Sequence, residues 1–203
     1  MSSLTCMGDS LTQGADIPVG QCWPTLVANQ LGLEVANCGI GGDTSAGMLA
    51  RFYAQVLTPK PQFVFILAGT NDLWWGWPLN IILGNLFSLV VQARHHGIAP
   101  LLGVPPPVNV AAAQACDFAP PEKGYARLTS NLADLADRLV RHANESEVPI
   151  VDLYHPFFEN RQIVRQDLFL PDGLHPNTRG HLTIARAVVA SMRENFHFAG
   201  KRS

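Results

Sequence analysis

The turn PDGLHPN, residues 171–177, holds an aspartate and a histidine, Asp172 and His175, three positions apart. Side chains with this spacing can face each other in a tight turn, and Pro171 and Pro176 stiffen its two ends. An imidazole held beside a carboxylate is the arrangement of a general base, because the carboxylate fixes the tautomer and stabilises the imidazolium. Taken alone, the pattern favours a simpler interpretation, a proline-rich turn in which Asp172 bonds to the backbone.

Ser10 is the side chain that such a base would activate. It lies in GDSLTQG, directly after a short apolar run and between Gly8 and Gly14. A serine at the start of a helix can cap it, and a serine beside a base can act as a nucleophile. The two roles are compatible. The adjacent Asp9 is expected to brace the loop by hydrogen bonds, because the side chains of neighbouring residues diverge.

Two further stretches offer donors for an oxyanion, the charged oxygen that forms when a nucleophile attacks a carbonyl. In GIGGDTS, glycines lead into a predicted helix, so the Gly42 N–H lies near the positive end of that helix. In GTND, Asn71 supplies an uncharged amide directly after the most apolar run. The simpler alternatives are a glycine turn and a turn asparagine, with Asp43 and Asp72 capping or holding their own turns.

Predicted strands and helices alternate along the chain. Strands are predicted over residues 4–7, 33–38, 62–69, 98–104 and 148–154. Helices are predicted over 21–31, 44–57 with Thr44 or Ser45 as the cap, Pro78 to about Gly97, 123–145 and 177–192, with a proline- and alanine-rich loop over 105–122. This order predicts a doubly wound, mostly parallel sheet in one domain, residues 1–203. The four chemically suggestive stretches then meet at the carboxyl edge of the sheet.

The four stretches, in this order, resemble the sequence blocks of the SGNH hydrolases, the GDSL esterase/lipase family. The blocks are GDSLTQG with Ser10, NCGIGGDTS with Gly42, GTND with Asn71, and DGLHPN with Asp172 and His175. The resemblance implies a flavodoxin-like, three-layer α/β/α sandwich with a five-stranded parallel sheet. It also implies a catalytic triad of Ser10, His175 and Asp172. The N–H groups of Ser10 and Gly42 and the side chain of Asn71 would form the oxyanion hole.

The activity that the resemblance implies is hydrolysis of carboxylic esters or thioesters through an acyl-enzyme, without metal or cofactor. The chain is most similar to small bacterial lysophospholipases, arylesterases and thioesterases, so small apolar, aryl or lysophospholipid-like esters are the expected substrates. A carbohydrate acetylesterase of the same family is the alternative. A metallophosphoesterase is a weaker one, because Ser10 would have no role and the DxH, GNH and GHxH patterns of metal ligands are missing.

His155 is the competing candidate for the base. It follows the last predicted strand and precedes Pro156. Because no carboxylate follows it at a comparable spacing, His155 ranks below His175.

The walls of the substrate pocket are expected to come from two segments. Trp74 and Trp75 follow Asn71 in the stretch LWWGWPLNIILGNLF and are predicted to line an acyl or aryl pocket. A mobile flap, an oligomer contact or packing on the domain itself are the alternatives for these tryptophans. The resemblance implies that the loop from Pro105 to Pro121, which includes Pro107 and follows the fourth predicted strand, forms another wall.

Composition limits the remaining possibilities. Apolar residues make up 47% of the chain and charged residues 15%, which suits a globular core. The net charge is −2 and no basic block occurs, so nucleic acid is not an expected partner. No window is apolar enough to span a bilayer, and no cation precedes Arg51, so a signal peptide is not predicted. A cytoplasmic location is expected, although an exported form without its leader would look the same, and the oligomeric state is not indicated.

Overall fold

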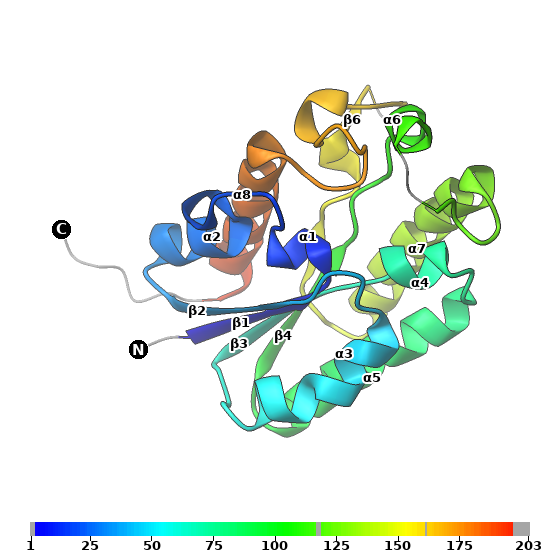
Figure 1. Ribbon diagram of the computed structural model, residues 1–203. Coiled ribbons are helices and arrows are strands. Elements are labelled where there is room, and N and C mark those ends of the chain that lie inside the picture. Colours follow the sequence, from blue (N-terminus) through cyan, green and yellow to red (C-terminus); the bar gives the residue numbers. More distant parts are fainter. Residues whose placement is uncertain (1–2, 117–118, 161, 197–203) are drawn as a thin grey trace.

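A five-stranded parallel sheet forms the middle layer of the protein (Figure 1). The computed structural model describes residues 3–116, 119–160 and 162–196. The strand order is β2-β1-β3-β4-β5. The strands are β1 (Ser3–Gly8), β2 (Glu34–Gly39), β3 (Phe63–Leu67), β4 (Ala99–Val104) and β5 (Ile150–Asp152). The predicted fold class is therefore confirmed.

Helices cover both faces of this sheet (Figure 1). Helices α2 (Trp23–Leu31) and α8 (Thr178–Asn195) share one apolar core with the sheet, and α3 (Ser45–Phe52), α5 (Leu79–His95) and α7 (Tyr125–Glu145) share the other. The central strand β3 supplies both cores, because side chains alternate between the faces of a strand. Phe63, Phe65 and Leu67 point into the first core and Val64 and Ile66 into the second, and all five are buried.

The predicted amphipathic helix over 123–145 is α7. Its leucine stripe of Leu128, Leu132, Leu135 and Leu139 is buried against the sheet, as the spacing predicts. Burying a leucine side chain contributes about 1.5–3 kcal/mol relative to leaving it exposed. The stripe therefore fixes which face of α7 meets the sheet.

Several short elements lie between the main ones. They are α1 (Ser10–Gln13), α4 (Thr70–Trp74), α6 (Val110–Ala115), the 3₁₀ turns Val19–Gln21, His155–Phe157 and Gln166–Leu168, and the antiparallel pair β6 (Phe158–Glu159) and β7 (Ile163–Val164). The helix predicted over 44–57 has Thr44 as its N-cap and ends in a wider π-helical turn, Tyr53–Leu57.

Two segments differ from the sequence expectation. The predicted loop over 105–122 contains α6, whose first turn is capped by the Asn109 side chain accepting the Ala112 N–H at 3.2 Å. The last strand covers Ile150–Asp152 only, shorter than the predicted 148–154. In both cases proline residues lie close to the segment, and they indicate turns without indicating where a helix or strand between them begins and ends.

The carboxyl ends of β1, β2 and β3 are aligned, which brings the segments that follow them together. Gly8 pairs with Gly39 on one side and with Leu67 on the other. A β-carbon on Gly39 would lie 2.1 Å from the Gln13 backbone nitrogen, so only glycine lets α1 pack this closely on the sheet edge. The register therefore places the Ser10, Gly42 and Asn71 segments side by side.

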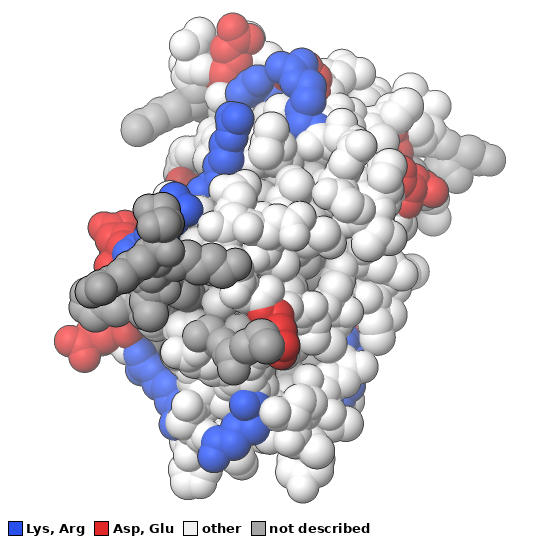
Figure 2. Space-filling model, turned by 90° about the vertical axis from the view of Figure 1, so that its left-hand side faces the viewer, with Lys and Arg blue, Asp and Glu red and all other residues white. Residues whose placement is uncertain are grey.

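The surface carries charges of both signs. On the face that Figure 2 shows, Lys and Arg side chains are interspersed with Asp and Glu around a broad uncharged area. No helix in the described part of the chain has the length and apolar character needed to cross a bilayer.

Candidate active site

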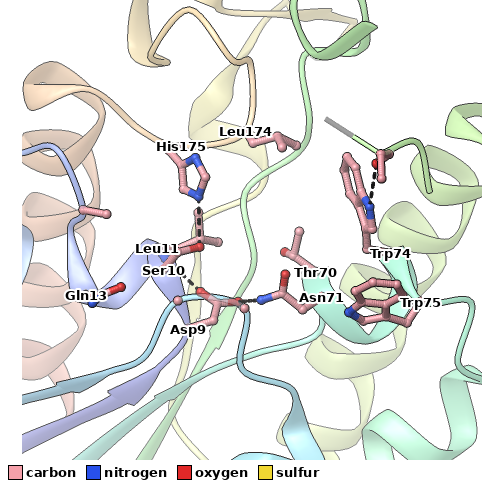
Figure 3. A pocket seen from close by; sticks show the side chains of 14 residues that line it. Asp9, Ser10, Leu11, Gln13, Thr70, Asn71, Trp74, Trp75, Leu174 and His175 are labelled. Atoms are coloured by element: carbon pink, nitrogen blue, oxygen red, sulfur yellow. Dashed lines mark hydrogen bonds between the residues drawn. The ribbon is translucent and has the colours of Figure 1, made fainter. Parts of the chain in front are cut away.

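Ser10 is the first residue of α1, at the carboxyl end of β1 (Figure 3). Its predecessor Asp9 is the N-cap, because the Asp9 carboxylate accepts the Leu11 N–H at 2.9 Å. Ser10 itself therefore does not cap the helix, a role that the sequence left open. The Ser10 hydroxyl makes its hydrogen bond to His175 instead.

His175 lies between Ser10 and Asp172. Its Nε2 is 3.0 Å from the Ser10 Oγ and its Nδ1 is 2.7 Å from Asp172 Oδ2. Asp172 Oδ1 also accepts the N–H groups of Leu174 and His175, at 2.8 and 2.9 Å. Burial raises the pKa of Asp172, but these hydrogen bonds outweigh it and hold the pKa below 3.8. An ionised carboxylate thus fixes the imidazole with Nε2 facing the serine.

The loop of Asp172 packs against the start of α6. Gly173 has a φ of +66°, and its carbonyl accepts the Asn109 N–H at 2.8 Å. A β-carbon at Gly173 would lie 2.5 Å from the Asn109 carbonyl oxygen. Helix α6, absent from the sequence prediction, therefore helps to position the loop that carries Asp172 and His175.

A second Asp–His pair repeats the geometry of the first. Asp152 Oδ1 accepts the N–H groups of Tyr154 and His155 at 2.9 and 3.0 Å, and His155 Nδ1 is 2.7 Å from Asp152 Oδ2. The sequence argument against His155 is incomplete, because the carboxylate partner precedes the histidine. Within the described chain, however, His155 is exposed and makes no hydrogen bond to a serine.

The candidate oxyanion donors lie at the same edge. Gly42 has a φ of +76°, in the region that favours glycine. The Asn71 Nδ2 donates to the Asp43 carbonyl oxygen at 2.9 Å and faces Asp9 Oδ2 at 3.3 Å. Ser10, Gly42 and Asn71 all line one cavity, so the structure brings the three together.

That cavity has a volume of about 480 Å³. The lining residues are Asp9, Ser10, Leu11, Gln13, Ala15, Gly41, Gly42, Thr70, Asn71, Trp74, Trp75, Ala119, Leu174 and His175. It therefore includes Trp74 and Trp75, as expected. It also includes Ala119, from the loop from Pro105 to Pro121 that was expected to form another wall, and Leu11 and Leu174, which no sequence signal singled out. Pro107 is buried and lines a separate cavity of about 460 Å³ beside Tyr154 and Phe158, so the structure does not bring it to this site.

The two tryptophans differ in their surroundings. Trp74 is partly buried, donates its Nε1–H to the Ala119 carbonyl at 3.2 Å and meets the Tyr125 ring edge-on at 5.8 Å. Trp75 is 60% exposed at the rim of the cavity. Trp74 therefore packs on the domain and lines the cavity at once, whereas the ring of Trp75 is open to solvent.

Three aspartates surround the candidate oxyanion hole. Asp43 accepts the Thr44 N–H at 2.9 Å and forms an ion pair with Arg51 at 2.6 Å. Asp72 was expected to hold its own turn, but it accepts the N–H and hydroxyl of Ser45 instead. This bond joins the starts of α4 and α3, and burial raises the pKa of Asp72.

Asp9 is the third of these aspartates and is 1% exposed. Burial raises its pKa to about 7, although the Leu11 N–H lowers it, and the negative charges of Asp72 and Asp43 raise it further. Among the described residues, no cluster of three His, Cys, Asp or Glu side chains could hold a metal ion.

Comparisons with known proteins indicate the family of the chain. The GDSL-like lipase/acylhydrolase family matches residues 6–182. An uncharacterised lipoprotein, YqeF, of Bacillus subtilis is 30% identical over 87% of this chain and 84% of its own length. An arylesterase of Vibrio mimicus is 28% identical over 93% and 87%. An acetylxylan esterase of Geobacillus stearothermophilus is 25% identical over 79% and 72%.

A solved structure shares the fold. The lipase/acylhydrolase of Enterococcus faecalis superposes with a TM-score of 0.78, covering 98% of this chain and all of the other, at 23% identity. The family match covers most of the chain, from the Cys6 of β1 into α8. The chain therefore belongs to the GDSL-like lipase/acylhydrolase family.

Proposed function

We propose that the protein is a serine esterase that cleaves carboxylic esters through an acyl-enzyme. His175 takes the proton of Ser10 as the serine Oγ attacks the ester carbonyl, and the same imidazole then protonates the leaving alcohol. Water repeats the cycle on the acyl-enzyme. The observation that carries the proposal is the continuous line of hydrogen bonds from Ser10 Oγ through His175 to Asp172, at 3.0 and 2.7 Å.

The charge that forms on the carbonyl oxygen is stabilised by the N–H groups of Ser10 and Gly42 and by the Asn71 amide. All three line the same cavity, and the amide adds no charge of its own. Donors that are already in place cost no reorganisation when the charge develops. This arrangement supports acyl transfer in particular, because the attacked carbon becomes tetrahedral within reach of both serine and donors.

The lining of the cavity supports a small neutral ester as the substrate. None of the described residues that line it is Lys or Arg, and Leu11, Leu174 and Trp74 supply apolar surface. Polyanionic acyl donors gain no charge-assisted hydrogen bonds from such a surface. Short acyl or aryl esters are therefore the proposed substrates. A lysophospholipid-like ester, or a thioester, fits if its charged group stays in solvent.

A sugar acetyl ester is the second candidate. The exposed ring of Trp75 and the exposed Gln13 at the rim offer an aromatic face and an amide, which suit a carbohydrate. The relative that is named an acetylxylan esterase agrees with this alternative. Comparing kcat/KM for p-nitrophenyl acetate, butyrate and octanoate with that for acetylated xylose separates the two substrate classes.

The test of the mechanism is hydrolysis of p-nitrophenyl butyrate by Ser10→Ala and His175→Ala. Each substitution is expected to lower kcat by at least about 10⁴-fold, as for other triads. His155→Ala is the matched control, because it removes an imidazole with the same Asp–His geometry and is expected to leave kcat within about twofold. Full activity of Ser10→Ala would refute the proposal. Loss of activity on treatment with EDTA would also refute it and would favour metal-dependent hydrolysis instead.

A further inference from the structure

Asp9 is a buried carboxyl group that the proposed mechanism does not use. It is 1% exposed and directly precedes Ser10. The nearby cation, Arg51, is committed elsewhere, to the Asp43 carboxylate at 2.6 Å and to the Gly8 carbonyl at 2.9 Å. An ionised carboxyl group in this position is unfavourable for the fold, because it is buried away from water and its neighbours Asp72 and Asp43 are also acidic. Its presence therefore calls for a functional explanation.

The two oxygens of Asp9 face two different donors (Figure 3). Oδ1 accepts the Leu11 N–H at 2.9 Å, within the helix that begins at Ser10. Oδ2 faces the Asn71 Nδ2 at 3.3 Å, in α4. Both groups can only donate here, so the position needs a side chain with two acceptors. The ionised carboxyl group, which predominates above its pKa of about 7, provides them, and an amide does not.

We propose that Asp9 is a positioning residue that orients the Asn71 amide toward the reacting carbonyl oxygen and couples it to the helix of Ser10. This inference rests on the proposed esterase function. The Asp43 carbonyl holds one hydrogen of Asn71 Nδ2 at 2.9 Å. Asp9 faces the other at 3.3 Å, and this second contact favours one orientation of the amide plane over its rotated alternatives.

The length of the second contact matters for catalysis. At 3.3 Å it lies beyond the usual range of N–H···O bonds, so this hydrogen is weakly held in the free enzyme. It can therefore be shared with an oxyanion that arrives in the cavity, while Asp43 keeps the other hydrogen. Asp9 thus holds the donor in place before the reaction without competing strongly during it.

The diagnostic variant is Asp9→Asn, which keeps the shape of the side chain but sets an NH₂ group against one of the two donors. At pH 8, where wild-type Asp9 is mostly ionised, we expect kcat for p-nitrophenyl butyrate to fall by about 10- to 100-fold, part of the 10²–10³ that an oxyanion donor contributes. The KM of this small substrate should change by less than about threefold, because Asp9 acts on the transition state. The melting temperature at pH 8 should not fall, since a buried charge has been removed.

A double-mutant cycle with Asn71→Ala distinguishes orientation of Asn71 from a general structural effect. In the Asn71→Ala background, Asp9→Asn should cost less than about threefold in kcat, because the amide that it orients is gone. Asp16→Asn, an exposed aspartate replaced in the same way, is the control and should leave kcat unchanged. Asp9→Ala is measured in parallel.

Three outcomes would overturn the proposal. They are full kcat in Asp9→Asn, an equal loss with and without Asn71, and loss of folding in both Asp9 variants, which would make the role purely structural. If the proposed esterase mechanism itself is wrong, the observation is different: the Ser10→Ala variant still hydrolyses p-nitrophenyl butyrate.

Discussion

Because the carboxyl group of Asp9 is buried, we expect the free energy of unfolding to depend on pH, and we expect the substitution Asp9→Asn to remove this dependence. Its pKa of about 7 lies roughly three units above the ordinary 3.8, and each unit corresponds to about 1.36 kcal/mol. The folded protein therefore binds this proton more tightly than the unfolded chain does. As a result, Asp9 lowers the free energy of unfolding as pH rises from about 4 to about 7, by roughly 4 kcal/mol in all.

Asp9→Asn should abolish this dependence. Between pH 5 and pH 8, the free energy of unfolding of the variant minus that of the wild type should rise by about 2–3 kcal/mol, because wild-type Asp9 ionises in this interval. The asparagine also leaves one donor badly paired, which costs about 1–3 kcal/mol. That cost is the same at both pH values. It lowers the free energy of unfolding of the variant equally at pH 5 and at pH 8, so the predicted change between the two pH values stays the same. Asp43 and Asp72, the acidic groups that face Asp9, are present in both proteins.

The measurement is urea unfolding at pH 5 and pH 8, followed by tryptophan fluorescence, since Trp23 is buried in the core. Asp16→Asn controls for the loss of one negative charge from the protein as a whole. The reasoning is refuted if the difference between Asp9→Asn and wild type is equal at the two pH values. It is also refuted if the free energy of unfolding of the wild type exceeds that of Asp9→Asn by more at pH 8 than at pH 5.

Two further predictions concern single positions in the site. Asn71→Ala should lower kcat for p-nitrophenyl butyrate by about 10²–10³-fold with little change in KM, measured by steady-state kinetics, and an unchanged kcat would exclude Asn71 from the oxyanion hole. Gly173→Ala should destabilise the fold by about 1–3 kcal/mol more than Gly97→Ala in thermal unfolding. Both glycines have positive φ angles, but a β-carbon at Gly173 would clash with Asn109, whereas a β-carbon at Gly97 would have no atom within 4 Å. Equal losses of stability would therefore show that the close contact between Gly173 and Asn109 is unimportant.

The parts of the site that the sequence predicts are those that form locally. Asp172 and His175 lie within one turn, and their spacing alone indicates the bond that the structure places at 2.7 Å. Ser10 and Asn71 follow apolar strands, and the parallel sheet brings such positions to one edge. Local spacing and the strand pattern therefore indicate which residues approach one another.

The bonds between segments could not be predicted in the same way. Asp72 reaches Ser45 across 27 residues, and Asp9 reaches Asn71 across 62. An aspartate can also bond to a backbone N–H within its own turn, as Asp9 does to the Leu11 N–H. The choice depends on the close packing of α1, α3 and α4, which residue types alone do not specify.

The cavity walls show the same limit. The assignment of Pro107 to the substrate pocket assumed that the whole loop after β4 turns toward Ser10. Helix α6 intervenes instead, and its N-cap Asn109 bonds to the Gly173 carbonyl of the Asp172 loop. Pro107 lies buried in a separate cavity, whereas Ala119, near the end of the same loop, lines the cavity of Ser10. An asparagine before the alanine run, Asn109, is the cap signal that indicates this helix.

The two Asp–His pairs have a consequence for how such enzymes can change. Four consecutive residues suffice to build the acid and the base, and the chain builds them twice, at Asp152–His155 and at Asp172–His175. The hydrogen bonds within this half of the machinery are local and therefore portable, although the position of the Asp172 loop also depends on its contact with Asn109. The nucleophile and its oxyanion donors require three aligned strands and are not portable. New activities on this scaffold should therefore arise more readily by moving an Asp–His loop to a fixed serine than by moving the serine.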